Sequence, residues 1–351
     1  MSRCQYTSRD EVIGVLDRLR QIEFPVEVLH LDPRWMRARR ELDNHHGTDF
    51  TWDQGRFGDP RAFFTELRER GVHVSLWENP YALSETGTHR ELDALGGIAH
   101  DVDGDAALPF EAPLGNECYV VDFTHEAARR WWKQRHHELL DLGASAFKTD
   151  FAEGVRDDTR FSDGRTGEEL HNVYALLYSR TVWEAEAEHG VEQPVLFGRS
   201  GWLGSHRYPL QWSGDSQCNW TDLRGALRAG LSAAMSGTAW WSCDIGGFYR
   251  IDEPLPEPEL YVRWAWLGLL APISRFHGTS PREPYHYGDA ACAAVVKAAK
   301  LRCSLLPYLQ SQRRDLASGM PIMRPMPLEF PGDTRLAGDA TQYMLGDALL
   351  H

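Results

Sequence analysis

Patterns typical of helices alternate with short apolar runs along almost the whole chain, and this alternation limits the fold more than any other feature. Apolar side chains recur at helical spacing, which predicts amphipathic helices, near residues 11–19, 60–70, 124–142 and 289–306. Short runs rich in β-branched and aromatic residues predict strands. These runs occupy residues 26–32, 73–77, 144–150, 194–200, 208–215, 237–247 and 271–278.

Apolar strands separated by helices predict a parallel sheet that is covered on its faces. The number of such units favours closure into a (β/α)8 barrel, the TIM barrel. An open doubly wound sheet is the alternative, but no glycine-rich phosphate-binding turn follows an early strand. Polar residues stand at the ends of nearly every expected strand, as in barrel enzymes. We therefore predict an α/β fold of the (β/α)8 type.

Both ends of the chain depart from the barrel pattern. The N-terminal "MSRCQY" is too short and polar for a complete strand, so we expect a truncated first strand. Residues 320–330 and 341–351 have the composition of β-strands. We predict a barrel over residues 1–318 and the beginning of a C-terminal β-sandwich domain over residues 319–351. As an incomplete fold, the chain alone is expected to be insoluble or inactive.

Charge and hydropathy limit the partners. The 351 residues include 51 acidic and 37 basic side chains, a formal net charge of −14, with no lysine or arginine run. We therefore expect neither a nucleic-acid nor a membrane partner, and a small neutral substrate suits the chain better. No apolar run could span a bilayer and the N-terminus is no signal peptide, so we expect a soluble cytoplasmic protein. Whether it forms a homo-oligomer stays open.

Neither the cysteines nor the histidines predict a metal site. Six cysteines are scattered without a CxxC pair, which indicates reduced thiols rather than a zinc site or a disulfide framework. His45 and His46 stand beside Asp43, but adjacent histidines cannot easily converge on one ion, so a solvated loop is the better interpretation. We expect no metal and no cofactor.

Carboxylates dominate the polar residues at the ends of the expected strands. No serine nucleophile elbow is present, because "GRSG" lacks the G-x-S-x-G spacing. Paired carboxylates without a metal are the groups used for glycoside hydrolysis, where one attacks the anomeric carbon and the other protonates the leaving oxygen. The strand ends carry Asp32, Trp77, Asp150, Arg199, Asp215, Asp244 and His277.

The tryptophans fit the same interpretation. The chain holds 13 of them, and flat indoles suit the apolar faces of sugar rings. Trp77 and Trp212 are the best candidates for contact with a sugar. For each of the others, including Trp220, Trp240 and Trp241, packing in the core is an equally good interpretation.

Five motifs in this order resemble glycoside hydrolase family 31: "FKTDFAEG", "LFGRSG", "WSGD", "SCDIGGF" and "SRFHG". The first is similar to the α-xylosidase branch, because Lys-Thr-Asp-Phe stands where animal and fungal α-glucosidases have Asp-Met-Asn-Glu. The resemblance implies a retaining enzyme with Asp150 as nucleophile and Asp215 as acid/base. Lys148 would keep Asp150 ionised and contact substrate hydroxyls, and Gly154 would let the chain turn away from the pocket.

The resemblance also implies that the surroundings of the two aspartates differ. Asp150 must be ionised and Asp215 must hold a proton at rest. A tryptophan-rich, partly desolvated environment around Asp215 would favour its neutral form. The residues expected to contact the sugar in the −1 subsite are Asp32, Arg199 and His277 through hydrogen bonds and Trp77 and Trp212 as aromatic walls.

Each polar residue of that set also has a structural interpretation. His277 could be a hydrogen-bonded core histidine, Arg199 an ion pair at the end of the barrel, and Asp32 a helix cap before Pro33. Asp244 is expected to support the site from behind. Cys243 precedes Asp244 in the sequence, at a position where the family usually has histidine.

Sugar specificity stays open between xylose and glucose, because one hydroxymethyl group is worth only about 1–3 kcal/mol of discrimination. Glu78 replaces an apolar residue after Trp77, and Pro33 stands in place of a cysteine. Arg3 or Arg34 could admit an acidic sugar, although pairing on the surface is the better interpretation. A sulfoquinovosidase, and a truncated carbohydrate-binding relative without activity, are the alternatives to an α-xylosidase or α-glucosidase.

Overall fold

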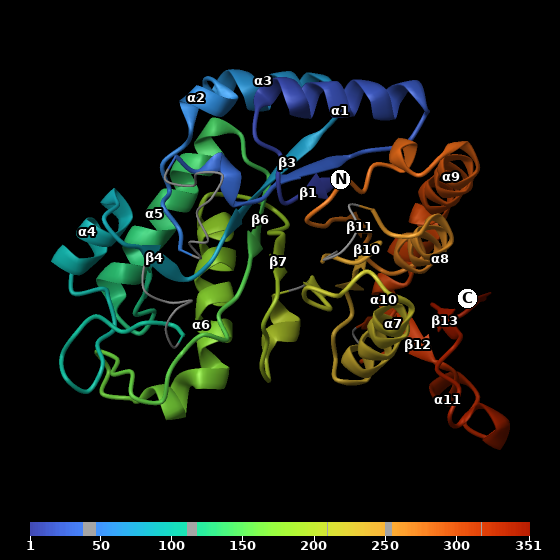
Figure 1. The fold of residues 1–351 in the computed structure, drawn as a ribbon. Helices are drawn as coiled ribbons and strands as arrows, with labels where there is room; N and C mark the ends of the chain where they lie inside the picture. Colours follow the sequence, from blue (N-terminus) through green and yellow to red (C-terminus); the bar gives the residue numbers. More distant parts are fainter. Residues whose placement is uncertain (38–46, 111–117, 209, 250–254, 317) are drawn as a thin grey trace. The chain divides into compact units, whose positions relative to one another are not determined.

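The computed structural model describes residues 1–37, 47–110, 118–208, 210–249, 255–316 and 318–351 (Figure 1). The histidine pair at 45–46 lies outside these residues. Internal contacts divide the chain into two compact units. The first comprises residues Met1–Gln5, Glu11–Glu27 and Pro209–His351, and the second Tyr6–Asp10 and Val28–Tyr208.

The second unit contains a parallel sheet. Strand β2 pairs with β3, β3 with β6 and β6 with β7, each time in parallel. Parallel neighbours need a crossover between them, and helices supply it. The strands are β2 (Val28–Leu31), β3 (His73–Glu78), β6 (Ala146–Thr149) and β7 (Leu196–Gly198), and the long helices are α3 (Pro60–Glu69), α5 (Glu126–Leu142) and α6 (Gly167–Glu188).

Local signals in the sequence set the helix ends in this unit. The Asp59 side chain accepts a hydrogen bond from Ala62 N at the start of α3, where Pro60 occupies the first turn. Helix α5 ends at Gly143, which has a φ of 120°, and a Cβ there would meet Phe64 at 3.2 Å. These helix boundaries agree with those that the sequence predicted.

Shorter elements complete the second unit. Strands β4 and β5 form an antiparallel pair, and the remaining segments are single turns or short helices. They are η1 (Pro33–Trp35), α2 (Gln54–Phe57), β4 (Tyr81–Leu83), α4 (Gly87–Ala94), β5 (Cys118–Val120) and η2 (Ser205–Arg207).

The first unit continues the alternation of strands and helices. Strands β8 and β9 are parallel neighbours, and so are β10 and β11. Helix α1 (Arg9–Gln21) belongs to this unit from Glu11 on. The other elements before residue 317 are β1 (Ser2–Arg3), β8 (Gln211–Trp212), α7 (Trp220–Met235), β9 (Trp241–Ser242), β10 (Asp244–Ile245), α8 (Pro258–Leu269), β11 (Arg275–Phe276), η3 (Pro284–His286), α9 (Asp289–Ser311) and α10 (Arg313–Leu316).

Each run that the sequence assigned to a strand contains one, although several strands are only two residues long. No helix in the described part of the chain combines the length and the apolar character needed to span a membrane.

The last residues form a small antiparallel sheet of three strands, β12 (Met323–Pro325), β13 (Tyr343–Leu345) and β14 (Leu349–Leu350). The strand prediction for residues 320–330 is wrong in its second half, where α11 (Met326–Glu329) forms instead, before η4 (Thr334–Leu336). Proline explains the change, because Pro327 cannot donate a ladder hydrogen bond but fits the first turn of a helix. A domain boundary at 318/319 stays a prediction.

A core of buried apolar side chains joins this small sheet to α7 and α8 within the first unit. It is built around Trp264, Leu260 and Leu267 of α8, and Ile322 and Tyr343 of the C-terminal segment pack against them. Trp264 and Ile322 are fully buried. The C-terminal segment therefore contributes several side chains to the hydrophobic core of this unit.

Candidate active site

Asp150 follows directly after β6, and its carboxylate is surrounded by donors. Lys148 Nζ lies 2.8 Å from Oδ2, and the indole Nε1 of Trp77 donates to the same oxygen at 2.7 Å. The backbone N–H of Phe151 donates to Oδ1 at 2.8 Å, and Arg199 Nη1 lies 3.5 Å from that oxygen. Only 4% of Asp150 is exposed. Burial acts to raise the pKa of this carboxyl, but the charges of Lys148 and Arg199 outweigh it and hold the pKa below its ordinary value.

Strand geometry explains why these groups meet. Side chains alternate along a strand, so Lys148 and Asp150 project to the same side. The parallel register of β3 and β6 sets Trp77 beside Lys148 and Glu78 beside Thr149. The backbone N–H of Asp150 also donates to the carbonyl of Glu78 at 2.9 Å. Two neighbouring strands therefore fix the nucleophile candidate through its backbone and its side chain.

Asp32 joins this group through Lys148. Its Oδ1 lies 3.3 Å from Lys148 Nζ and 2.9 Å from His30 Nε2, while His30 Nδ1 lies 2.9 Å from Ser75 Oγ. Asp32 precedes η1, yet its side chain makes no capping hydrogen bond there. The helix-cap interpretation is therefore wrong, and Lys148 bridges two buried carboxylates.

The structure confirms the ion-pair interpretation of Arg199, and its contact with a sugar stays a prediction. Its Nη2 lies 2.8 Å from Glu153, which is an ion pair, and its guanidinium also faces Asp150. The guanidinium carbon stands 4.5 Å from the centre of the Phe151 ring.

The chain turns away from Asp150 through two residues other than glycine. Phe151 and Ala152 have φ values of 57° and 77°, in the left-handed region. The role predicted for Gly154 as the turning residue is wrong, because Gly154 is not in that region. It is needed for close approach instead, since a Cβ there would lie 2.6 Å from both the Tyr81 hydroxyl and Phe110. The Gly154 N–H donates to that hydroxyl at 2.8 Å.

The remaining predicted residues lie in the first unit. Trp212 ends β8 and is 4% exposed, and Asp215 follows it in a half-buried loop. Asp244 is fully buried in an ion pair with Arg275, its register partner in β11. The Arg275 guanidinium lies 5.1 Å from the centre of the Trp212 ring. Asp244 thus supports Trp212 through Arg275, a residue that the sequence analysis did not single out although it stands in "SRFHG".

His277 is fully buried in the first unit. Its Nδ1 contacts the Ser2 hydroxyl, and its ring centre lies 5.2 Å from that of Phe248. Burial raises the pKa of the Cys243 thiol, which precedes Asp244 in the sequence, to about 12, so Cys243 stays protonated. In the structure none of the six cysteines forms a disulfide bond.

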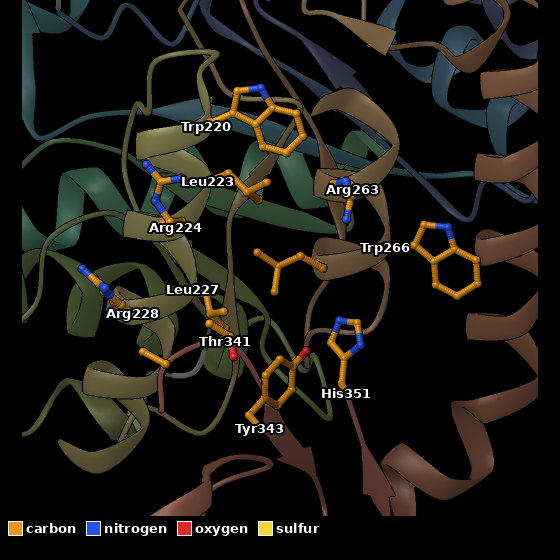
Figure 2. A pocket seen from close by; sticks show the side chains of 12 residues that line it. Trp220, Leu223, Arg224, Leu227, Arg228, Arg263, Trp266, Thr341, Tyr343 and His351 are labelled. Carbon is orange, nitrogen blue, oxygen red and sulfur yellow. The ribbon is translucent and has the colours of Figure 1, made fainter. Parts of the chain in front are cut away.

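Within the ranges that the structure describes, no three histidine, cysteine, aspartate or glutamate side chains gather closely enough to hold a metal ion. A separate pocket of about 500 Å³ lies in the first unit between α7, α8 and the C-terminal segment (Figure 2). Trp220 and Trp266 contribute aromatic rings to it, and Tyr343 and His351 close one side. None of the predicted site residues lines this pocket.

Comparison with known proteins shows which class of enzymes the chain resembles. Residues 1–312 match the family described as "Glycosyl hydrolases family 31 TIM-barrel domain", and residues 319–351 match "Glycosyl hydrolase family 31 C-terminal domain". A dextranase of Flavobacterium johnsoniae complexed with glucose superposes with a TM-score of 0.91 at 28% identity, covering 99% of this chain and 44% of that one. The predicted TIM-barrel fold is therefore confirmed, and with it the class of barrel glycosidases.

Proteins that are similar in sequence show to which family of glycosidases the chain belongs. An α-xylosidase of Emericella nidulans is 36% identical over 98% of this chain and 43% of that protein. The α-xylosidase XylQ of Lactiplantibacillus pentosus is 34% identical over 98% of this chain and 44% of that protein. The chain belongs to glycoside hydrolase family 31. It spans less than half the length of these curated relatives.

Proposed function

We propose that the protein is a retaining α-glycosidase, of α-xylosidase type, that cleaves a small α-glycoside or oligosaccharide. The observation that carries this proposal is the buried carboxylate of Asp150 between two cations and the Trp77 indole. Because its pKa lies below the ordinary value, Asp150 stays anionic, as a nucleophile must. The two α-xylosidase relatives support the choice of sugar.

The proposed mechanism is a double displacement with two aspartates. Asp150 Oδ1 or Oδ2 attacks the anomeric carbon while Asp215 gives its proton to the leaving oxygen. Asp215 then takes a proton from water, which attacks the same carbon and releases the sugar with its configuration retained. In this proposal Lys148 contacts sugar hydroxyls, and so do Asp32, Arg199 and His277. Trp77 and Trp212 form the aromatic walls for the sugar ring.

A panel of aryl α-xylosides, α-glucosides and α-galactosides tests this proposal on the whole protein. We expect the α-xyloside to be hydrolysed fastest and Asp150→Asn to lower kcat by at least roughly a thousandfold. Asp157→Asn, an exposed aspartate in the following loop, is the matched control and should retain activity. Absence of turnover on every α-glycoside, or an active Asp150→Asn variant, would overturn the proposal.

An α-glucoside substrate is the second candidate, because the structural relative named above is a dextranase complexed with glucose. Faster hydrolysis of the aryl α-glucoside in the same panel would select it. The sulfoquinovosidase and the inactive carbohydrate-binding relative remain alternatives, and a sulfoquinovoside added to the panel separates them. The cytoplasmic location stays a prediction.

A further inference from the structure

Glu78 and His136 make a buried contact on the far side of the strand that carries Trp77. Consecutive residues of a strand point to opposite faces. Trp77 accordingly reaches Asp150, whereas the Glu78 carboxylate lies against α5 and α6. His136 Nε2 of α5 lies 3.0 Å from Glu78 Oε2, and the Tyr178 hydroxyl of α6 donates to Oε1 at 2.9 Å. Glu78 is 1% exposed and His136 is fully buried.

The hydrogen bonds of His136 determine how many protons the pair holds. His136 Nδ1 lies 2.8 Å from the carbonyl oxygen of Trp132, and a carbonyl only accepts, so Nδ1 carries a proton. In a neutral imidazole Nε2 would then be a bare acceptor facing a carboxylate oxygen. Neither Nε2 nor Oε2 has a hydrogen-bond partner elsewhere in the described residues. Two acceptor atoms 3.0 Å apart in a buried site repel each other, so we expect one of the two groups to carry a further proton.

The surroundings decide which group holds that proton. Glu78 accepts a hydrogen bond from Tyr178, which favours its carboxylate form. The His136 ring is enclosed by the rings of Phe147 and Phe50, with centres 4.4 Å and 5.5 Å away, and aromatic electrons attract a cation. Both observations favour an imidazolium beside a carboxylate. The distance between His136 Nε2 and Glu78 Oε2 is that of an ion pair, although the two groups are not aligned as in a linear hydrogen bond.

We propose that His136 is a buried imidazolium paired with Glu78, and that this pair positions the nucleophile Asp150 through β3. The second half of this statement rests on the proposed function. The link is short, because the Glu78 carbonyl accepts the Asp150 N–H at 2.9 Å. The adjacent Trp77 donates its indole N–H to the Asp150 carboxylate. Glu78 is therefore a positioning residue, since movement of its side chain shifts two of the groups that orient Asp150.

No other charge near the pair replaces the proposed His136 cation within the described residues. On α6, burial raises the pKa of Tyr178 well above its ordinary value, with a further contribution from the Glu78 charge, so Tyr178 stays a donor. Burial raises the pKa of Glu186 on the same helix to about 8, with the charge of Glu78 adding to it, so Glu186 is mostly neutral at pH 7. On β6, Lys148 projects to the opposite face and pairs with Asp150. His136 is therefore the counter-charge of Glu78.

Nitrogen NMR of the whole protein tests the charge state directly. Long-range ¹H–¹⁵N spectra at about pH 8 distinguish an imidazolium, with both nitrogens protonated, from a neutral tautomer, and free imidazole side chains are neutral at that pH. Contacts with the Phe147 ring protons assign the His136 signal without any variant. We expect both nitrogens of His136 to be protonated. A neutral His136 would overturn the proposal, and this result does not depend on enzymatic activity.

Kinetics of the whole protein test the positioning role. We expect Glu78→Gln to lower kcat on an aryl α-xyloside by about tenfold to a hundredfold, because small displacements of reacting groups are costly, with KM changed by less than about twofold. Glu192→Gln, an exposed glutamate, is the matched control.

If Glu78→Gln does not fold, Tyr178→Phe, which removes only the donor to Oε1, should show a smaller loss of kcat in the same direction. Unchanged kcat in a folded variant beside a cationic His136 would refute the positioning role. Lack of any glycosidase activity in the unmodified protein would count against the proposed function instead.

Discussion

A buried aspartate stays anionic only when nearby cations compensate the loss of hydration. At Asp150 the loss of hydration is the largest effect on the pKa, and Lys148 and Arg199 more than compensate it. Lys148 is itself shared with Asp32, so its charge serves two carboxylates. The nucleophile candidate therefore depends on one lysine more than on any other residue.

Replacing Lys148 should shift the pH profile of the enzyme. Lys148→Met removes the nearest cation, so the pKa of Asp150 rises and Asp150 becomes protonated at higher pH than in the unmodified protein. The acid limb of kcat/KM on an activated aryl α-xyloside is therefore expected to move to higher pH. Lys297→Met, at an exposed position of α9, serves as the control. An acid limb that stays in place would show that Lys148 does not set the charge of Asp150.

Replacing Asp215 should affect substrates according to their leaving groups. Asp215→Ala removes the proposed proton donor, which matters for poor leaving groups and little for glycosyl fluorides. We expect kcat/KM to fall by about a hundredfold or more on an alkyl α-xyloside and far less on α-xylosyl fluoride. Steady-state kinetics on the two substrates provide the measurement, and equal losses on both would argue against the acid/base role.

At the scale of single residues, sequence patterns predicted which residue types stand at strand ends but not all of their contacts. Asp32 is an example, because its neighbour Pro33 suggested a helix cap whereas its side chain turns to Lys148. Gly154 is another, because close packing against Tyr81 and Phe110 depends on residues far away in the sequence. Arg275 was missed since an arginine inside a strand has no signature of its own.

At the scale of elements, helix α6 carries a buried acid that makes stability depend on pH. The Glu186 carboxylate accepts the N–H of Val195 just before β7, and burial raises its pKa from 4.5 to about 8. The folded protein therefore binds this proton more tightly than the unfolded chain. Between these two pH values the unfolded state loses its proton first, so this carboxyl destabilises the fold increasingly as pH rises from about 4.5 to about 8.

Glu186→Gln should remove this dependence. Glutamine can still accept the Val195 N–H and carries no charge, so the variant should gain stability relative to the unmodified protein as pH rises. The gain is at most about 1.4 kcal/mol per pH unit. Chemical denaturation at about pH 5 and about pH 8 measures the difference, with Glu192→Gln as the control. A difference that is the same at both pH values would contradict the raised pKa of Glu186.

Element boundaries were predictable where a local signal marks them. Asp59 with Pro60, and Gly143, define helix ends through their own side chains and backbone, and these ends were found as expected. The strand lengths were not predictable, because pairing rather than composition determines where a strand stops. Residues 326–329 show the limit most clearly, since their apolar character suits a strand and Pro327 shifts them into a helix.

At the scale of the whole molecule, the order of motifs along the chain carried more information than any single motif. Alternating strands and helices predicted the TIM barrel, and the five ordered motifs predicted the family, which the match over residues 1–312 confirms. The positions of Asp150 and Asp215 in two different compact units follow only from the structure. Local sequence patterns carry no signal for that division, because it depends on contacts summed over the whole chain.

The central claim is that Asp150 forms the covalent bond to the sugar, and trapping this intermediate tests it most directly. A 5-fluoro-α-xylosyl fluoride should label the whole protein once, because the ring fluorine slows both displacements while the fluoride leaving group keeps the first faster than the second. Tryptic digestion isolates the peptide of residues 149–156, and tandem mass spectrometry distinguishes Asp150 from Glu153 within it. We predict the label on Asp150 and its absence in Asp150→Asn. A label on Glu153, or on a peptide that contains Asp215, would contradict the account.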